Sequence, residues 1–401
     1  MQLQRLQVSP NLRGLMSYPK LRGPVPRVLI LESKYWIDAA CRRAAAQLGW
    51  DVASTPVVLE GAFSREMVTQ YLDTLVRFKP DFVLSINLSG MDVSGMFAAL
   101  FEDLAIPHVT WFVDDPRTIL MDSTRYSNEY SVALTWERGY AGYLHSLGFL
   151  AVHCVPLAAD DTLFQGTPGP GILAPAFVGT AMVDNANLAW NELSQRPELA
   201  QHCANAIHDG NVTRDSFIKG IDAILEKETL ENVDAEGRRH AEMYFFIEGT
   251  RRLRHALVCA LEPEGLVVYG SADWQGVAYS YKRPIDYETE LPALYRDCEV
   301  NLNTTSIQMP TAVNQRVFDC PAAGGFLLTD CQATLGELFD LESDVATYDS
   351  LDECADKLRH YRANPEERLR IASNAQSRIL HEHTYKHRLR HIVAIVRSLY
   401  G

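Results

Sequence analysis

The sequence predicts an α/β protein built from two doubly wound domains. Short apolar strands alternate with amphipathic helices at the spacing of βαβ units, which favours parallel sheets. At 401 residues the chain exceeds what one hydrophobic core usually serves, and a stretch rich in Pro, Gly and Asp at 158–171 divides it. We therefore expect a loosely ordered lead-in at 1–26, a first domain at 27–157, a linker at 158–171, a second domain at 172–383 and a final helix at 384–401.

The composition, 47% hydrophobic and 22% charged, is typical of a soluble globular protein. The net charge of −14 argues against a nucleic-acid partner, because binding a phosphate backbone needs a clustered basic surface. The eight cysteines form no C-x-x-C pair, which indicates reduced thiols in a cytoplasmic protein. The sequence has neither a signal-peptide pattern nor an apolar run of 18 residues, so we expect no membrane span.

The first domain begins with an apolar strand at 27–32 and an alanine-rich helix that ends at Gly49. Strands are then expected at 51–59, 82–87, 107–113, 131–136 and 150–155, with helices at 64–78, 93–104 and 138–147. In a doubly wound sheet, ligands bind beyond the carboxyl ends of the strands. That rule selects the loops that contain Glu32, Lys34, Tyr35, Asn87 and Asp114.

Two adjacent carboxylates, Asp114 and Asp115, follow the strand at 107–113. A carboxylate at this place could deprotonate an acceptor hydroxyl or stabilise positive charge that develops on a sugar. The alternative is that one of them caps the helix that Pro116 begins. Neighbouring residues of an extended chain point in opposite directions, so we expect one of the two to face a ligand.

The second domain opens with a strand at 176–180 that ends in Gly179 and Thr180. A helical pattern at about 184–260 follows, and the sequence assigns it no role. The loop after a strand at 266–270 carries Lys282 and Arg283 among aromatic residues. These side chains are expected to reach a base or a phosphate, or else to form a structural aromatic loop. The domain ends with a strand at 343–347 and helices at 350–362 and 365–381.

The most informative stretch runs from Tyr295 to Asp330. It predicts a strand at 299–303, a polar loop, a brief helix that carries Arg316 and Asp319, a glycine pair and a strand at 326–329. The helix N-terminus and the guanidinium would bind a diphosphate, while the carboxylate accepts hydrogen bonds from a ribose diol. Gly324 and Gly325 would let the backbone approach a ligand closely. The alternative is an i,i+3 ion pair on a solvated helix that ends in a glycine cap.

These residues resemble a known family. The segments NQRVFD at 314–319, AGGFLLTD at 323–330 and EHTY at 382–385 are similar to the donor-domain pattern of CgeB-like (spore-maturation-type) glycosyltransferases. The segment TWFVDDP at 110–116 is similar to the N-terminal motif of the same family. In place of the Glu that many related enzymes use for the ribose, this chain has Asp319.

The resemblance implies the GT-B fold, in which two Rossmann-like domains face a cleft and a C-terminal helix crosses back to the first domain. It implies transfer of a sugar from a nucleotide-diphosphate sugar in the second domain to a hydroxyl of a protein, glycan or small molecule held by the first. We expect no metal ion, because the sequence lacks the D-x-D triplet that GT-A enzymes use. A nucleotide-sugar 2-epimerase of the same architecture and a non-catalytic nucleotide-sugar sensor remain as alternatives.

The predicted site is therefore as follows. Asp114 and Asp115 are the catalytic candidates, and Glu32, Lys34, Tyr35 and Asn87 form the acceptor-side loops. The expected donor-binding residues are Arg316, Asp319, Gly324, Gly325, Asn303, Thr305, Asn314, Gly179, Thr180, Lys282 and Arg283. His383 and His387 have the i,i+4 spacing of metal ligands, but a third ligand and the Glu of an H-E-x-x-H motif are missing. We therefore expect His381, His383 and His387 to pack or cap helices.

Overall fold

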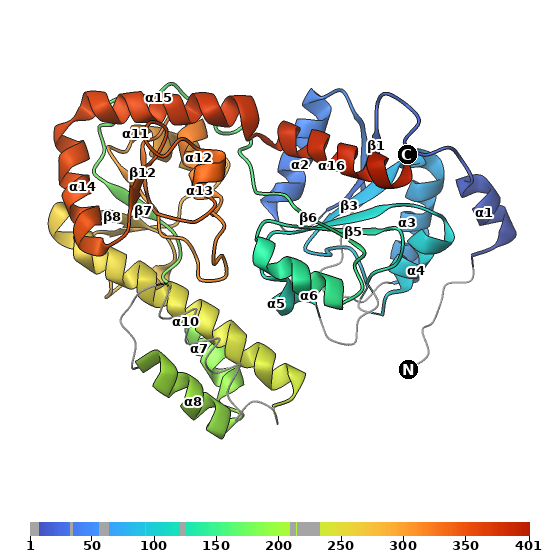
Figure 1. Ribbon diagram of the computed structural model, residues 1–401, viewed down its shortest axis with the longest axis horizontal. Helices are drawn as coiled ribbons and strands as arrows, with labels where there is room; N and C mark the ends of the chain where they lie inside the picture. The colour runs from blue at the N-terminus through green and yellow to red at the C-terminus, as the bar shows by residue number, and fades with distance from the viewer. Residues whose placement is uncertain are drawn as a thin grey trace. The chain divides into compact units, whose positions relative to one another are not determined.

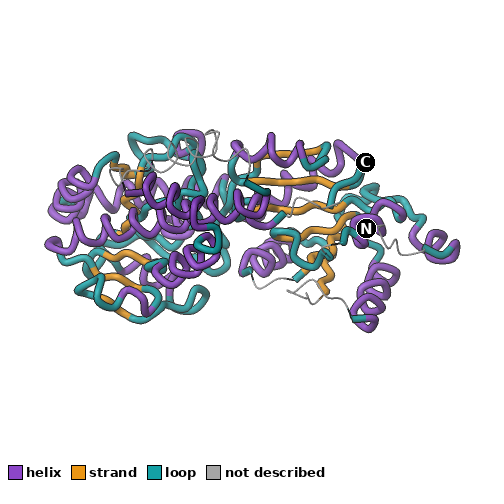
Figure 2. The backbone as a smooth tube through the Cα atoms, turned by 90° about the horizontal axis from the view of Figure 1, so that it is seen from below, coloured by secondary structure: helices purple, strands orange, loops and turns teal. Residues whose placement is uncertain are grey.

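In the computed structural model the chain forms two compact units, Met1–Leu157 with Thr384–Gly401 and Ala158–His383. The structure describes residues 8–32, 35–55, 64–92, 94–120, 126–208, 214 and 233–401. Each unit contains a six-stranded parallel sheet flanked by helices (Figures 1 and 2). The predicted fold class, α/β with two doubly wound domains, is confirmed.

The sheet of the first unit has the strand order β2-β1-β3-β4-β5-β6. Its central strands are buried along their whole length, as expected for apolar strands that helices cover on both faces. The strands are β1 (Arg27–Leu31), β2 (Asp51–Thr55), β3 (Phe82–Ile86), β4 (His108–Phe112), β5 (Ser131–Thr135) and β6 (Ala151–Cys154). The helices are α1 (Pro10–Met16), α2 (Trp36–Gln47), α3 (Arg65–Phe78), α4 (Met96–Asp103), α5 (Pro116–Ile119), the 3₁₀ turn η1 (Arg138–Tyr140), α6 (Ala141–Ser146) and α16 (Tyr385–Tyr400).

Residues 8–26 are more ordered than the sequence suggests. Ser9 caps α1, and Met16 at the end of that helix is fully buried. The Asp81 carboxylate then accepts hydrogen bonds from the backbone N–H groups of Leu21 and Arg27, each at 2.8 Å. This segment is therefore fixed to the first unit by contacts with residues far along the chain, which its own composition does not reveal.

The sheet of the second unit has the order β12-β11-β10-β7-β8-β9. Its strands are β7 (Ala176–Val178), β8 (Val267–Tyr269), β9 (Tyr281–Lys282), β10 (Asn301–Leu302), β11 (Leu327–Asp330) and β12 (Ala346–Tyr348). The chain runs from β7 to β8 and β9 on one side, and then continues with β10 on the other side of β7. The carboxyl ends of β7 and β10 thus form a topological switch point, where doubly wound sheets bind ligands.

The helices of the second unit include a lobe made of α7 (Val183–Leu193), α8 (Pro197–His208) and the first half of α10 (Ala235–Leu261), which projects away from the sheet in Figure 1. This helical lobe has a hydrophobic core of its own, which includes Leu193, Cys203 and Phe245. The remaining elements are η3 (Glu262–Glu264), η4 (Ala272–Trp274), α11 (Leu291–Asp297), α12 (Arg316–Ala322), α13 (Leu335–Leu338), α14 (Leu351–Ala363) and α15 (Pro365–Glu382).

The stretch at 158–171, expected to be a linker, packs closely on the second unit. The Gln376 side chain donates a 2.7 Å hydrogen bond to the carbonyl of Gly166, and Arg368 donates to that of Pro170. A Cβ atom at Gly166 would lie 2.1 Å from the carbonyl oxygen of Ala323, so no larger residue fits there. Gly171 is similar, since a Cβ atom there would lie 2.6 Å from the Cα of Glu299, so both glycines serve close packing.

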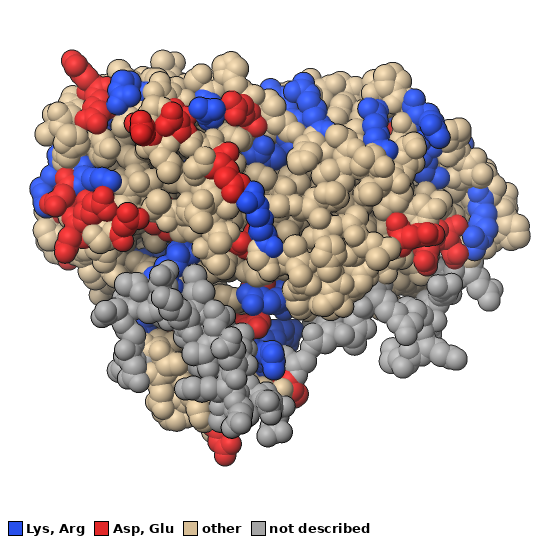
Figure 3. Space-filling view, viewed as in Figure 1, with Lys and Arg blue, Asp and Glu red and all other residues tan. Residues whose placement is uncertain are grey.

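Two surface properties bear on function. No helix in the described part of the chain is both long enough and apolar enough to span a membrane. On the face drawn in Figure 3, the described Lys and Arg side chains are interspersed with Asp and Glu, so this face has no continuous basic surface.

Candidate functional site

The structure places Arg316 at the switch point of the second unit. It is the first residue of α12, and its guanidinium donates to the side-chain oxygen of Asn303 and to the carbonyl of Val178. Asn303 is itself fixed, because its side-chain oxygen also accepts a 2.9 Å hydrogen bond from Asn314. The Nε atom of Arg316 is buried and has no hydrogen-bond partner. Asn303 and Asn314 thus orient the arginine at the carboxyl ends of β7 and β10.

A second arginine, which sequence analysis did not select, reaches the same place. Arg254 of α10 donates to the hydroxyl and the carbonyl oxygen of Thr180, at 2.8 and 2.9 Å. Burial, followed by the positive charge of Arg316, lowers the pKa of Arg254 to about 10. The side chain therefore stays charged at neutral pH, and its Nε atom, like that of Arg316, is buried without a partner.

Within the described part of the chain, neither Arg254 nor Arg316 has a carboxylate partner. The neighbouring arginines of α10 behave differently, since Arg251 and Arg252 share the carboxylate of Glu248 at 2.6 and 2.7 Å. Two nearby positive charges without a counter-charge are costly unless an anion joins them. The arrangement is therefore suited to a multiply charged anion such as a diphosphate.

The helix N-termini at this place are already satisfied by the chain itself. The first N–H groups of α12 donate to the carbonyls of Asn314 and Gln315, at 3.1 and 3.0 Å. At the start of α7, the N–H of Val183 donates to the Asp273 carboxylate at 2.9 Å. The N–H groups of Val317, Phe318 and Val183 are thus engaged within the protein, and the two guanidinium groups supply the positive charge at this place.

Gly179 lies between the two arginines in the chain segment that they contact. A Cβ atom there would lie 3.2 Å from the Phe177 ring and 3.6 Å from the guanidinium of Arg316. The Gly179 carbonyl accepts a 2.7 Å hydrogen bond from the indole of Trp274. Gly179 and Thr180 therefore belong to the site, because this segment supplies the carbonyl groups that hold both guanidinium groups.

Asp319 is buried, with 1% of its surface exposed, and forms no ion pair with Arg316. Its two carboxylate oxygens accept 2.7 Å hydrogen bonds from the hydroxyl of Tyr287 and the side-chain amide of Gln315. Burial outweighs these bonds and raises the pKa of Asp319 to about 8. The alternative of a solvated ion pair is therefore wrong, and a ribose diol could reach this carboxyl only if the groups that cover it moved.

The space beside the glycine pair after α12 is filled by the protein's own backbone. Gly324 has φ of 85°, and a Cβ atom there would lie 2.9 Å from the backbone nitrogen of Pro168. A Cβ atom at Gly325 would lie 2.4 Å from the carbonyl of Tyr295. The close approach expected for a ligand is thus made by neighbouring backbone, and packing explains why both positions need glycine.

Three further residues expected to bind the donor are engaged within the protein or exposed. Thr305 is buried, and its backbone N–H and hydroxyl donate to the Asp330 carboxylate at 3.0 and 2.9 Å. Arg283 forms an exposed ion pair with Glu290. Lys282 lies exposed on β9, in a stretch expected to be a loop. None of the three has a described contact with Arg316 or Arg254.

In the first unit, Asp114 is held at the carboxyl ends of β3 and β4. The side-chain amide of Asn87 donates to the Asp114 carboxylate at 2.8 Å and accepts from the N–H of Val113 at 2.8 Å. Tyr35 bonds to Asn87 and Asp114, and burial, with the Asp114 charge, raises the pKa of its hydroxyl. Asp114 remains partly exposed. This group of an acid, an amide and a phenol is therefore the candidate acceptor site.

Asp115 has a structural role. It is fully buried, accepts from the N–H of Arg117 at 2.9 Å as the cap of α5, and pairs with the Arg117 guanidinium at 2.7 Å. The hydroxyl of Tyr140 donates a third hydrogen bond at 3.0 Å. The capping alternative is therefore correct for Asp115, and Asp114 remains as the catalytic candidate.

The remaining residues selected from the sequence are Glu32, Lys34 and the histidines near the C-terminus. Glu32 pairs with Arg42 and accepts a 2.7 Å hydrogen bond from Ser54, while Lys34 lies outside the described residues. His383 contacts the carbonyl of Leu338 at 2.9 Å, and His387 takes part in the capping box of α16. Among the described residues, no group of three His, Cys, Asp or Glu is placed to hold a metal ion.

Comparisons with known proteins concern the fold and part of the sequence. Residues 239–394 match the model of a family described as glycosyl transferase-like, whereas no curated protein sequence matches the chain. Sucrose-phosphate synthase from Thermosynechococcus elongatus is 12% identical, with a TM-score of 0.52 over 94% of this chain and 99% of that chain. HepE from Anabaena, in complex with UDP and glucose, is 12% identical, with a TM-score of 0.54 over 93% and 100%.

A third similar structure is that of BGT from phage T4 in complex with UDP-glucose, which is 9% identical with a TM-score of 0.50 over 94% and 99% of the two chains. At these identities the likeness concerns the fold, and the family match concerns residues 239–394. The chain therefore has the GT-B fold of glycosyltransferases and carries a glycosyl transferase-like sequence over that part of its length.

Proposed function

We propose that the chain is a glycosyltransferase that takes a sugar from a nucleoside-diphosphate sugar bound by the second unit. The observation that carries this proposal is the pair of Arg254 and Arg316 at the switch point, which has no carboxylate partner among the described residues. In such a reaction the bond between the anomeric carbon and the diphosphate breaks, and negative charge develops on the departing phosphate. Two fixed guanidinium groups stabilise that charge.

The acceptor is a hydroxyl group bound near Asp114 in the first unit. As the hydroxyl oxygen bonds to the anomeric carbon, its proton passes to the Asp114 carboxylate and the diphosphate leaves with the electrons of the broken bond. Asn87 holds Asp114 through the 2.8 Å hydrogen bond to its carboxylate. Asp115 takes no part in this reaction, because its buried carboxylate is already bonded to Arg117 and Tyr140.

Among glycosyltransferases, we assign the chain to the CgeB-like type on the motifs at 110–116, 314–319, 323–330 and 382–385. The acceptor class then includes proteins, glycans and small molecules. The eight cysteines are free thiols, which suits a reducing compartment such as the cytoplasm. Because the Anabaena HepE and phage T4 structures contain UDP or UDP-glucose, UDP-glucose is the first donor to test.

The experiment begins with a thermal-shift screen of nucleoside diphosphates and nucleotide sugars, since a compound that binds the native state raises its melting temperature. The Arg254→Ala and Arg316→Ala variants should lose the shift, whereas Arg359→Ala, which removes an exposed partner of Glu264, should keep it. If no compound shifts the wild type, the proposal is wrong.

The product then separates the candidate functions. A transferase releases nucleoside diphosphate from the nucleotide sugar, slowly to water and faster when an acceptor is added. A 2-epimerase instead gives an isomeric nucleotide sugar without free diphosphate. A sensor binds the nucleotide sugar and gives no product under either condition.

A further inference from the structure

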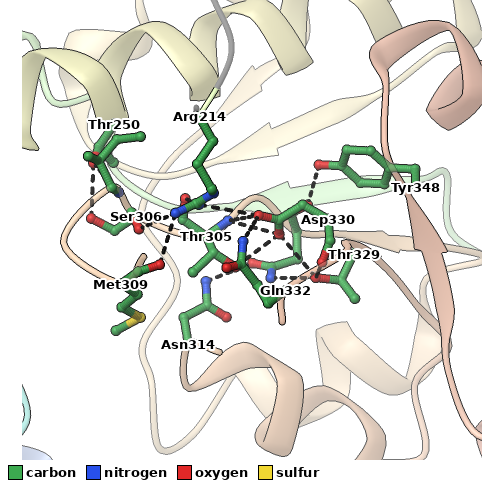
Figure 4. A network of polar contacts seen from close by, with 12 residues as sticks. Arg214, Thr250, Thr305, Ser306, Met309, Asn314, Thr329, Asp330, Gln332 and Tyr348 are labelled. Carbon is green, nitrogen blue, oxygen red and sulfur yellow. Dashed lines mark hydrogen bonds and ion pairs between the residues drawn. The ribbon is translucent and has the colours of Figure 1, made fainter. Parts of the chain in front are cut away.

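Arg214, which lies between α8 and α10 in the sequence, contacts the loop between β10 and α12. Arg214 donates to the carbonyls of Ser306 and Met309, at 3.0 and 2.9 Å, and to that of Thr305 (Figure 4). It also contacts the Asp330 carboxylate at 3.3 Å. Its side chain is only 16% exposed. An arginine with three acceptors on one short loop and a fourth at the end of β11 holds that loop in place, because the donors of a guanidinium have a rigid planar geometry.

Thr250 of α10 holds the same loop. The hydroxyl of Thr250, in the middle of α10, lies 2.9 Å from that of Ser306 and accepts a 3.1 Å hydrogen bond from the N–H of Ile307. The Ile307 side chain is fully buried in the core of the lobe, together with Leu193 and Phe245. The loop is thus attached by polar contacts on its backbone and by an apolar contact through its side chain.

The ends of this loop carry the two residues that orient Arg316. Asn303 begins it and Asn314 ends it, and the side-chain oxygen of Asn303 accepts from both Asn314 and Arg316. Asp330 connects Arg214 to the start of this loop, since it accepts hydrogen bonds from the N–H of Thr305 at 3.0 Å and from Arg214. Any displacement of residues 304–309 would therefore move the groups that determine where the Arg316 guanidinium lies.

We propose that Arg214 and Thr250 are positioning residues for the diphosphate site, and that the helical lobe serves to hold the loop at 303–314. This inference rests on the proposed function for the identity of the bound group, a nucleoside diphosphate. It gives a role to a helical segment for which the sequence suggested none. It also predicts that binding at Arg316 depends on contacts made by residues that touch neither the phosphate nor the reacting sugar.

The test uses the full-length chain and variants with matched controls. Thr250→Val removes the hydroxyl and keeps the shape of the side chain, whereas Thr250→Ser keeps the hydroxyl. Arg214→Gln removes the four contacts. Arg252→Gln is the control, because Arg252 binds Glu248 and the carbonyl of Ile207, both within the lobe. A general loss of lobe stability would affect this control as much as the other variants.

Two quantities are measured below the melting temperature of every variant. Calorimetry gives the Kd for UDP, which should rise roughly 3- to 30-fold in Thr250→Val and Arg214→Gln, the range of couplings through a positioning contact. Thr250→Ser and Arg252→Gln should keep the wild-type Kd. Hydrogen exchange gives the protection of the amides at 303–314, which should fall in the first two variants and not in the controls.

The outcomes separate this inference from the proposed function. Unchanged protection at 303–314 in Thr250→Val and Arg214→Gln overturns the inference, whether or not UDP binds. Lower protection with an unchanged Kd overturns the positioning role. If the wild type binds UDP, lower protection together with a raised Kd for UDP in Thr250→Val and Arg214→Gln supports the inference. If the wild type binds no nucleoside diphosphate, the proposed function fails, and the positioning of Arg316 for a diphosphate fails with it.

Discussion

Arg254 and Arg316 contact one short segment of chain at the end of β7, Arg316 through the carbonyl of Val178 and Arg254 through Thr180. Their charges repel, since Arg316 contributes to the lowered pKa of Arg254. The carbonyl groups reduce this repulsion but supply no full negative charge. Under the proposed function, a bound dianion would relieve this repulsion, and we therefore expect the pair to act as a preorganised site.

We first predict that each arginine contributes separately to diphosphate affinity. Arg316→Ala and Arg254→Ala should each weaken UDP binding by about 1.5–3 kcal/mol, the range for a lost hydrogen bond to a charged group. Isothermal calorimetry at constant ionic strength measures the effect, and Arg359→Ala is the control because its partners Glu264 and Asp356 lie on an exposed surface. Wild-type affinity in the Arg254 variant would remove that residue from the site.

The second prediction separates the two adjacent carboxylates of the first unit. Asp114→Asn should bind UDP like the wild type and lower kcat by about 10²–10⁴, the usual contribution of a general base. Asp115→Asn should instead lower the free energy of unfolding by about 1–3 kcal/mol, because it weakens the buried contacts of Arg117 and Tyr140. Initial rates and denaturant unfolding measure the two effects. Full turnover in Asp114→Asn would contradict its role as the base.

The alternation of strands and helices was sufficient to predict the fold, because it depends on local patterns. The strand expected at 82–87 is β3 (Phe82–Ile86), and the helix expected at 365–381 is α15 (Pro365–Glu382). The two-residue strand β9 was missed, since Tyr281 and Lys282 show no apolar alternation of their own. A strand this short is defined by its neighbour β8 and leaves little trace in the sequence.

The site was predicted less completely, for a physical reason. Arg316 could be selected as a candidate because its neighbours form a motif. Arg254 lies in a long helix among other arginines, and only the fold brings it to Thr180. Gly324 and Gly325, in contrast, were selected for a close approach that the protein's own backbone makes. A sequence indicates that a close approach occurs at a glycine, but not whether a ligand or the protein's own backbone makes it.

The third prediction concerns metal ions. Because two guanidinium groups are available to neutralise the departing diphosphate, we expect turnover to continue in excess EDTA. Initial rates with and without the chelator, followed by addition of Mg²⁺ or Mn²⁺, measure this. A rate that falls in EDTA and is restored by either ion would show that the arginines alone do not carry the charge.

The fourth prediction concerns pH and Asp319. Burial raises the pKa of this carboxyl to about 8 in the folded protein, against an ordinary value of 3.8. The unfolded chain therefore releases this proton at lower pH than the folded one. The stabilisation that the protonated Asp319 gives to the fold is thus complete below about pH 4. That contribution falls as the pH rises towards 8. Asp319→Asn removes the dependence.

Denaturant unfolding of wild type and Asp319→Asn at intervals between pH 5 and pH 8.5 measures this effect. The stability of the wild type relative to the variant should decrease with rising pH, by up to about 4 kcal/mol over the range. Asp344 is the control, because its pKa is shifted in the opposite direction. Burial raises its pKa, but hydrogen bonds from Arg378, the N–H of Asp340 and Ser343 outweigh burial and lower it. Its contribution is therefore lost only as the pH falls below the ordinary value, and Asp344→Asn should differ from wild type by a constant amount over this range. A constant difference for Asp319→Asn as well would show that Asp319 is ionised in the folded protein throughout.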